Sequence, residues 1–449
     1  MAADLHQALK RVLREGPRTS AELSVALGVS QPTLSRTIQS YPQSITSFRV
    51  RGDRTPRYAL LRALPAGLES RQKVYRVTRS GTFTPFADLE FLSNGSTLER
   101  VAGPNGRATL YDGLPPYMNF AAPSGFLGRQ LARELALAQG FPQSLSDWRD
   151  EHRIAYLFTR GLNLPGNLVF GNISLQLEMD LLQARSVPDA EKLPAYVEMA
   201  SALKSAVYGS SAGGEQPKFL WLTETGHVIV KFAKLGSRMA ELLPLEHLAL
   251  RALAEVGVPA SRTQLLTADD YVFLEVERFD RVGLNGRVGL LSAGAIDDEF
   301  FGRRDSWPEF AARCETARML SSQDARHVDT MAAFSELIGN GDRHFENISL
   351  LIDEEGDYQG IAPAYDILPM RYASIGGGVD PDLTPIQPKV GPIGANPEVW
   401  GRAARAANSF WLAAQTEKLA APISDAMRRL AAENQIAVGR FVAPLVPGD

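Results

Sequence analysis

Hydrophobic residues in the first 62 positions recur first with a helical period and then with the alternation typical of strands. A first helix is predicted from an apolar stripe that repeats at Leu5, Leu9 and Leu13. Thr19 and Glu22 form a capping box that predicts the start of a second helix, and Gly28 follows its last apolar residue. The pattern therefore predicts two short helices before residue 30.

A third helix is predicted after Ser30, with Leu34 and Ile38 on its buried side. Small polar, amide and basic side chains are left facing outward, at Gln31, Thr33, Ser35, Arg36 and Gln39. The next segment, ITSFRVRGDRTPRYALL, predicts two strands around a Gly52-Asp53 turn. Four arginines lie on or near this hairpin, namely Arg49, Arg51, Arg54 and Arg57.

These elements resemble a winged helix-turn-helix over residues 1–62. Outward-facing polar side chains suit a recognition helix in the major groove of DNA, and a basic wing suits phosphate contacts. Residues 1–62 carry a net charge of +6 and the remainder −10, within a total of −4. This asymmetry in charge favours duplex DNA as a partner of residues 1–62 and not of the rest of the chain. The alternative is a small helical domain that docks onto another protein.

The rest of the chain contains segments with the helical repeat of apolar residues and segments with the alternation typical of strands. Residues 63–70 contain Pro65 and Gly67 and are predicted to form a linker. From residue 73 to residue 200, strand-like runs alternate with helical ones, whereas residues 201–290 combine strands with one helix and residues 291–449 are mainly helical. A length of 449 residues requires more than one domain. We therefore expect an α+β protein with several domains.

The cysteine count and the distribution of apolar residues indicate in which cellular compartment the protein resides. Cys314 is the single cysteine, which excludes a disulfide framework and a cysteine-rich zinc site. The N-terminus lacks the pattern of a cleavable signal, and no run approaches the ~18 apolar residues of a membrane span. We therefore expect a cytoplasmic protein without a membrane partner.

Two segments of the second half suit phosphate binding. The run GSSAGGEQPKF combines serines with Gly213 and Gly214, which let backbone amides approach a phosphate closely. Lys231 lies on a mostly buried face of the predicted strand HVIVKFA, and Glu246 lies among apolar residues of the next helix. Glu246 could pair with Lys231, and Glu241 is the rival partner. The structural alternatives are an ordinary turn and solvated charged side chains.

The strongest chemical signal is IGNGDRHFENISLLID followed by GIAPAYDILPM. Asp342 and Asn347 lie five residues apart in a loop before a strand, and Asp366 follows a second short strand 24 residues after Asp342. An aspartate that orients a hydroxyl, together with an asparagine and an aspartate that bind Mg²⁺, are the parts of a protein-kinase catalytic centre. The alternative is that all three are turn or cap residues.

NGDRHFEN and AYDILP are similar to the catalytic-loop and metal-binding segments of the HipA family of bacterial toxin kinases. VERFDR resembles its interlobe segment, and LYDGLPPYMNF with GFLGR resembles its accessory region, so that the resemblance covers roughly residues 75–440. It implies a two-lobed protein-kinase-like α+β core, preceded here by the winged helix-turn-helix. The expected parts are 1–62 for DNA binding, 73–200 as the accessory region, 201–290 as the N-lobe with the glycine-rich loop, and 291–449 as the C-lobe.

The resemblance also implies roles for single residues. Asp342 becomes the catalytic aspartate, Asn347 and Asp366 become Mg²⁺ ligands, and Lys231 becomes the lysine that contacts the phosphates. The nucleotide site would include Glu246, Glu277, Phe279, Asp280, Gly213, Gly214 and His344. His344 matches the family's loop histidine, and the alternative is that it only packs against the loop and orients it. The family's inhibitory autophosphorylated serine falls on Ser210 or Ser211.

The expected function is therefore an ATP- and Mg²⁺-dependent serine/threonine protein kinase with a fused DNA-binding module. Family analogy implies an aminoacyl-tRNA synthetase as the protein substrate and an antitoxin partner, and a palindromic DNA site would call for a homodimer. Family toxins usually work with a separate helix-turn-helix antitoxin, whereas this chain carries such a module itself. The rivals are a nucleotide-sensing transcriptional regulator with an inactive kinase-like body and a small-molecule kinase.

Overall fold

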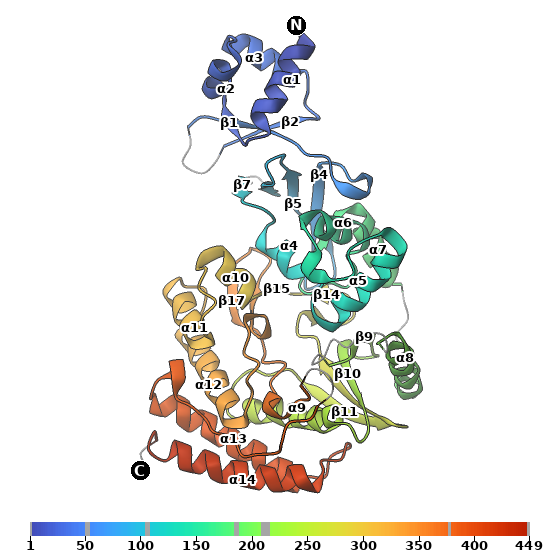
Figure 1. The fold of residues 1–449 in the computed structure, drawn as a ribbon, viewed down its shortest axis with the longest axis vertical. Helices are drawn as coiled ribbons and strands as arrows, with labels where there is room; N and C mark the ends of the chain where they lie inside the picture. The colour runs from blue at the N-terminus through green and yellow to red at the C-terminus, as the bar shows by residue number, and fades with distance from the viewer. Residues whose placement is uncertain are drawn as a thin grey trace. The chain divides into compact units, whose positions relative to one another are not determined.

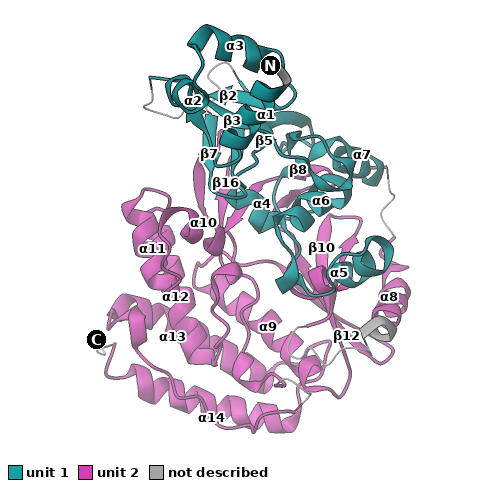
Figure 2. Ribbon diagram, turned by 45° about the horizontal axis from the view of Figure 1, so that its top comes forward, with its two compact units in different colours: residues 1–123, 131–183 teal, residues 124–130, 184–449 magenta. Residues whose placement is uncertain are grey.

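The computed structural model describes residues 2–49, 54–103, 108–183, 188–207, 216–375 and 379–446. The chain forms two compact units (Figure 2). Unit 1 comprises Met1–Pro123 and Leu131–Gln183, and unit 2 comprises Ser124–Gln130 and Ala184–Asp449. The described residues contain no helix that is both long and apolar enough to span a bilayer. The expected four-part division stays a prediction.

Unit 1 begins with three helices and a small antiparallel sheet (Figure 1). The helices are α1 (Ala2–Leu13), α2 (Ser20–Leu27) and α3 (Gln31–Gln39), and the strands β1 (Arg18–Thr19), β2 (Ile45–Phe48) and β3 (Arg57–Leu60) pair in the order β1-β3-β2. Both halves of the predicted capping box at Thr19 and Glu22 are present, and Gly28 ends α2 in the left-handed conformation with φ 63°. The predicted helices and strands are confirmed here, while the Gly52-Asp53 turn lies outside the described residues.

The rest of unit 1 is a five-stranded sheet covered by helices. The strands β4 (Arg71–Val77), β5 (Phe83–Phe91), β6 (Thr97–Val101), β7 (Ala108–Tyr111) and β8 (Leu168–Phe170) pair in the order β7-β6-β5-β4-β8. The helices are α4 (Pro116–Ala121), α5 (Gly125–Gln139), α6 (Asp150–Arg160) and α7 (Gly171–Leu181). Leu64 packs into the core of this region, with residues such as Phe91 and Phe158. The prediction of a linker at residues 63–70 is therefore wrong, because an apolar anchor holds the segment against the sheet.

A buried carboxylate joins the N-terminal module to this sheet. Glu90 of β5 accepts hydrogen bonds from Thr46 Oγ1 at 2.6 Å and Arg71 Nε at 2.8 Å, and Arg100 lies 3.3 Å away. Arg100 also donates to the carbonyl of Ser47 at 2.7 Å. Because Thr46 and Ser47 belong to β2, the module is attached to the rest of unit 1 by specific polar contacts.

The N-terminal half of unit 2 is a four-stranded antiparallel sheet between two helices. The strands β9 (Lys218–Leu222), β10 (His227–Lys234), β11 (Thr263–Ala268) and β12 (Tyr271–Glu277) pair in the order β11-β12-β10-β9. Helix α8 (Lys192–Val207) contributes Tyr196 to a cluster with Val230 and Phe273, whereas α9 (Arg238–Glu255) contributes Leu243 to one with Leu274. Alternation along β10 thus directs Val230 toward α8 and Lys231 toward α9.

The C-terminal half of unit 2 is mainly helical, as predicted. Its largest hydrophobic cluster includes Trp307, Trp400 and Trp411. The helices are α10 (Ala293–Phe300), α11 (Trp307–Thr316), α12 (Ser322–Ile338), α13 (Pro397–Thr416) and α14 (Asp425–Val442). Two small antiparallel sheets accompany them: β13 (Arg281–Val282) with β14 (Gly286–Arg287), and β15 (Gly289–Ser292) with β16 (Ser349–Ile352) and β17 (Tyr358–Ile361).

Candidate active site

Lys231 lies at the centre of a buried cluster of charges. Its Nζ donates to Glu246 Oε1 of α9 at 2.5 Å and also to the carboxylate of Asp366. Lys231 is 4% exposed and Glu246 is fully buried. The rival partner Glu241 instead accepts from Arg238 at 2.7 Å. The structure therefore brings Lys231, Glu246 and Asp366 together, although 135 residues separate Lys231 from Asp366.

The charges in this cluster control one another. Burial by itself would lower the pKa of Lys231, but the carboxylates of Asp366 and Glu246 outweigh it and hold the pKa above its usual value. Burial would raise the pKa of Asp366, but the adjacent ammonium group of Lys231 lowers it overall. Full burial raises the pKa of Glu246 despite its contact with Lys231. The contact between Lys231 and Asp366 thus favours the charged form of both side chains.

Asp366 has a strained backbone. Its φ is 54°, in the left-handed region that side chains other than glycine adopt at a cost. About a third of its side chain is exposed. Since such strain persists only where the surrounding fold imposes it, the conformation is a specific feature of the β17–Asp366 connection.

The loop of Asp342 and Asn347 begins where α12 ends. Gly339 closes that helix with φ 77°, and Asn340 Oδ1 accepts from the backbone amide of Asp342 at 3.1 Å. Asn347 Nδ2 donates to the carbonyl oxygen of Asp342 at 2.9 Å, which closes the loop. This hydrogen bond uses the side-chain nitrogen of Asn347, so the side-chain oxygen can still accept a bond or bind a cation. The predicted hairpin follows, as β16 and β17.

Tyr365 connects the loop to the segment of Asp366. Its hydroxyl donates to the carbonyl oxygen of Glu346 at 2.8 Å and lies 2.8 Å from Ser349 Oγ. Its ring is 5.5 Å from that of Phe279 in the interlobe segment. Tyr365 therefore ties three predicted site segments together, a role that sequence reasoning missed because a tyrosine in AYDILP carries no distinguishing signal.

His344 lies between two carboxylates. Its Nε2 is 3.6 Å from Asp342 Oδ1, and its Nδ1 is 3.3 Å from Glu346 Oε2. The hydrogen bond with Glu346, helped by the charge of Asp342, raises the pKa of His344 despite partial burial. The contact with His344 in turn lowers the pKa of Glu346 to about 2. Both carboxylates thus stabilise the charged form of the imidazole relative to a free histidine.

The interlobe residues have different environments. Glu277 ends β12 and is exposed, whereas Asp280 is buried and accepts from Arg278 at 2.8 Å and Arg281 at 2.7 Å. A polar hollow of about 340 Å³ is lined by Glu277, Arg278, Arg281 and neighbours. The carboxylate of Asp280 is thus engaged in ion pairs, which leaves the backbone as the part of this segment best suited to contact a base.

Lys218 is a further basic residue at this site. It lies opposite Lys231 in the β9–β10 register, and its charge lowers the pKa of Asp366. Sequence reasoning missed it because the register of two strands decides which lysines become neighbours. The glycine-rich run just before it, with Ser210, Ser211, Gly213 and Gly214, lies outside the described residues.

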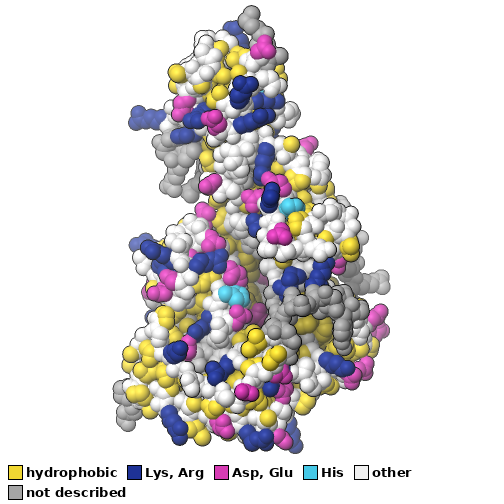
Figure 3. All heavy atoms as spheres, viewed as in Figure 1, with side chains coloured by type: hydrophobic (Ala, Val, Ile, Leu, Met, Phe, Trp, Pro, Cys, Tyr) yellow, Lys and Arg dark blue, Asp and Glu magenta, His cyan; other side chains and the backbone are white. Residues whose placement is uncertain are grey.

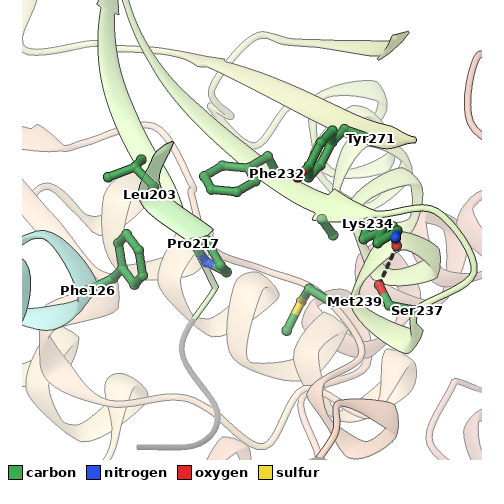
Figure 4. Close-up of a pocket in the computed structure, with 9 residues that line it drawn as sticks. Phe126, Leu203, Pro217, Phe232, Lys234, Ser237, Met239 and Tyr271 are labelled. Carbon is green, nitrogen blue, oxygen red and sulfur yellow. Dashed lines mark hydrogen bonds between the residues drawn. The ribbon is translucent and has the colours of Figure 1, made fainter. Parts of the chain in front are cut away.

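A cavity of about 220 Å³ lies at the end of β10 that is farther from the interlobe segment (Figure 4). Phe126, Leu203, Phe232, Met239 and Tyr271 supply its carbon-rich lining. The hydrogen bond drawn there, from Ser237 Oγ to the carbonyl of Lys234 at 2.6 Å, is internal to the chain. A lining of this kind does not suit phosphate groups, which need several hydrogen-bond donors.

The proposed DNA-contacting side chains lie on the surface of the N-terminal module. Leu34 is 1% exposed, whereas the predicted contact residues around it are exposed, namely Gln31, Thr33, Ser35, Arg36 and Gln39. Arg49 and Arg54 are exposed and Arg57 is half-buried, while Arg51 lies outside the described residues. Lys and Arg side chains are visible over this part of the molecule (Figure 3). The predicted division of α3 into a buried and a polar side is confirmed.

Two family models match the chain. One, described as a YjjJ-like toxin, middle domain, matches residues 68–179, and the other, described as a HipA-like C-terminal domain, matches residues 210–434. The toxin YjjJ of Escherichia coli (strain K12) is 34% identical to the protein over 437 residues, which cover 95% of this chain and 96% of that toxin.

A solved structure shares the fold. It is a chain from the Shewanella oneidensis MR-1 toxin–antitoxin complex of HipA, HipB and operator DNA, with a TM-score of 0.50. The sequence identity is 14%, and the match covers 84% of this chain and all of that chain. An identity this low supports a statement about the fold alone. The sequence matches show that the chain belongs to the HipA family of toxin kinases, and the structural match shows that it has the kinase-like α+β fold of that family.

Proposed function

We propose that the protein is an ATP- and Mg²⁺-dependent kinase that transfers the γ-phosphate to a serine or threonine hydroxyl of a protein. The observation that carries this proposal is the position of Lys231, which contacts both Glu246 and Asp366. A strand lysine paired with a helix glutamate, beside an aspartate suited to a metal, is the arrangement by which protein kinases hold nucleotide phosphates.

The donor atoms at the site fit Mg²⁺. Asp366 offers carboxylate oxygens and Asn347 an amide oxygen, which are ligands preferred by this hard cation. Within the described ranges no cluster of three or more His, Cys, Asp or Glu residues could hold a metal unaided. This agrees with an ion held by one or two side chains together with substrate phosphates. Such an ion would neutralise charge on the transferred phosphate.

The chain's own residues would do the rest. Lys231 and Lys218 would bind phosphate oxygens, and Gly213 and Gly214 would offer backbone amides to them. Glu277, Phe279 and Asp280 would contact the nucleoside, mainly through backbone groups. Asp342 would accept a hydrogen bond from the attacking hydroxyl and orient it toward the phosphate. Positioning and charge neutralisation would then supply most of the catalysis.

The glycine-rich run is the proposed site of self-inhibition. A phosphate on Ser210 or Ser211 would add about −1.5 to −2 charge and three acceptor oxygens. These oxygens would compete with ATP for the same amides or repel its phosphates. The enzyme would thereby inactivate itself.

Duplex DNA binding is the second proposed activity, and it rests on the polar exposed side of α3. The related solved HipA complex contains HipB and operator DNA. In this protein the DNA contacts would come from residues 1–62 of the same chain. Two copies of the protein would bind a palindromic site as a homodimer. A separate antitoxin partner is also proposed, and an aminoacyl-tRNA synthetase is the proposed class of protein substrate.

A direct test is incubation of the full-length protein and cell lysate with radiolabelled ATP, with Mg²⁺ or with a chelator. Labelled protein bands that require Mg²⁺ and are lost in the Asp342→Asn variant are the expected result. Label only in small molecules would favour the small-molecule kinase. ATP binding without any transfer would favour the nucleotide-sensing regulator.

A further inference from the structure

Arg304 occupies an unusual loop between α10 and α11. Its φ is 47°, in the left-handed region, although it has a long side chain. The fully buried carboxylate of Asp297 accepts from the backbone amides of Arg303 at 2.8 Å and Arg304 at 2.9 Å. Arg313 donates to the same carboxylate at 3.0 Å. The loop conformation is therefore held by a buried anion beneath it, which offsets the cost of the backbone strain.

This conformation directs Arg304 onto the catalytic loop. Its guanidinium group makes a two-pronged contact with Asp298, at 2.8 and 2.6 Å, and donates to Glu346 Oε1 at 2.6 Å. The group also lies 5.9 Å from the ring centre of Phe345. The planar guanidinium is thus held at two edges by half-exposed carboxylates, and its contact with Glu346 restricts the orientations open to that side chain.

Two neighbours lie directly against this contact. A methyl group added at Gly294 would lie 2.4 Å from Glu346 Oε1 and 2.8 Å from a guanidinium nitrogen of Arg304, so a larger residue there would push the ends of these two side chains away from their present positions. At the other end of the loop, Trp307 Nε1 donates to the carbonyl oxygen of His344 at 3.1 Å. One short loop thus holds both the side chain of Glu346 and the backbone of His344.

Glu346 passes this constraint to the reacting centre. Its second oxygen faces Nδ1 of His344 at 3.3 Å, and Nε2 of the same ring faces Asp342 at 3.6 Å. A carboxylate on one ring nitrogen sets the orientation of a histidine toward whatever the other nitrogen contacts. We propose that Arg304 is a positioning residue, which acts through Glu346 to hold His344 against Asp342. The inference rests on the proposed kinase function.

The test is steady-state kinetics of full-length variants with a protein substrate identified by labelling. Arg304→Gln is expected to lower kcat by about 10- to 100-fold, the usual cost of removing an outer orienting partner. KM for ATP should remain close to that of the native protein, because Arg304 lies outside the phosphate-binding strand. The melting temperature should fall little, because the neighbours of Arg304 are the half-exposed carboxylates of Asp298 and Glu346 and the ring of Phe345. Arg304→Lys should recover part of kcat, since lysine keeps the positive charge but cannot make the two-pronged contact of a guanidinium group.

A double-mutant cycle separates positioning from a general structural effect. On a His344→Ala background, Arg304→Gln should change kcat by less than about twofold, because its target is gone. Arg402→Gln, which removes a surface pair 3.4 Å from Glu398, is the matched control and should behave as native. If Arg304→Gln unfolds the protein, Asp298→Asn loosens the same guanidinium and should lower kcat in the same way.

Two outcomes would overturn the inference alone: native kcat in stable Arg304→Gln and Asp298→Asn variants, or equal losses with and without His344. Absence of transfer by the native protein would overturn the proposed function, and the inference with it.

Discussion

Lys231 Nζ and Glu246 Oε1 lie 2.5 Å apart inside unit 2, and neither residue is more than 4% exposed. Replacing Lys231 with Met should lower transfer by at least about 100-fold, because a fixed cation at the phosphates is lost. It should also destabilise the fold by about 3 kcal/mol, since Glu246 is left buried without its counter-charge. Activity assays and denaturant unfolding measure the two effects separately.

The matched variant is Lys231→Met combined with Glu246→Met. The double variant should recover most of the lost stability, because it removes the buried carboxylate of Glu246 that has lost its counter-charge. It should recover none of the activity, because the positive charge of Lys231 at the phosphates is still missing. Recovery of activity by the double variant would contradict a role for Lys231 in holding phosphate.

Asp342→Asn and Asp366→Asn should each abolish phosphate transfer. The first removes the proposed acceptor for the substrate hydroxyl, and the second removes a proposed carboxylate ligand for Mg²⁺. Asp357→Asn is a suitable control, because this exposed residue lies in the turn of the β16–β17 hairpin, away from Lys231. Undiminished labelling by both site variants would remove the assignment of the catalytic centre.

Ser210 or Ser211 should carry a phosphate after incubation of the protein with Mg²⁺ and ATP, and the modified protein should lose activity. Mass spectrometry of residues 209–218 measures the modification, and the Asp342→Asn variant is the control that should stay unmodified. A Ser210→Ala, Ser211→Ala double variant should keep its activity during the incubation. An active enzyme with an unmodified segment would contradict self-inhibition at this site.

Full-length protein should bind duplex DNA with an affinity that falls steeply with salt. Removing Arg36, Arg49 and Arg54 by alanine substitution should reduce the slope of log K against log salt by about 0.9 for each lost phosphate contact. Fluorescence anisotropy at several salt concentrations gives this slope, with Arg402→Gln as a control far along the chain. DNA binding that persists after deletion of residues 1–62 would place the DNA site elsewhere.

Asp329 on α12 should make stability depend on pH. Burial, with the charge of Glu315, raises the pKa of its carboxyl to about 6. The folded protein therefore holds this proton more tightly than the unfolded chain, so the stability that protonation provides is present below about pH 4 and is lost as pH rises through 6. Asp329→Asn should gain about 2 kcal/mol at pH 7.5 and little at pH 4. Equal effects at both pH values would contradict the shifted pKa.

Local patterns predicted the elements that depend on neighbouring residues. The capping box at Thr19, the buried side of α3 and the hairpin after Asn347 were all readable, because each depends on spacing within a few residues. The pairing of Lys231 with Glu246 was one of the possibilities that the sequence left open, beside a pairing with Glu241, because both glutamates follow Lys231 across one strand-to-helix connection.

Contacts between distant segments were not readable. Lys218 becomes a neighbour of Lys231 only through strand register, and Arg304 reaches Glu346 only through a left-handed backbone that no local rule requires. The expected linker at residues 63–70 failed for a related reason. Proline and glycine indicated a break in regular structure, but the burial of Leu64 depends on the sheet that follows.

The two units are not consecutive pieces of chain. Ser124–Gln130 belongs to unit 2, although the segments on either side of it belong to unit 1. A recombinant kinase fragment that starts at residue 184 or 201 would therefore lack Phe126, and the apolar cavity beside Phe232 and Leu203 would lose one wall to solvent. Such a fragment should be prone to aggregation, because apolar residues of the cavity become exposed. A fragment that ends at residue 183 should instead contain the first turns of helix α5 without the part of unit 2 to which they belong. Soluble kinase preparations will require a start before Ser124.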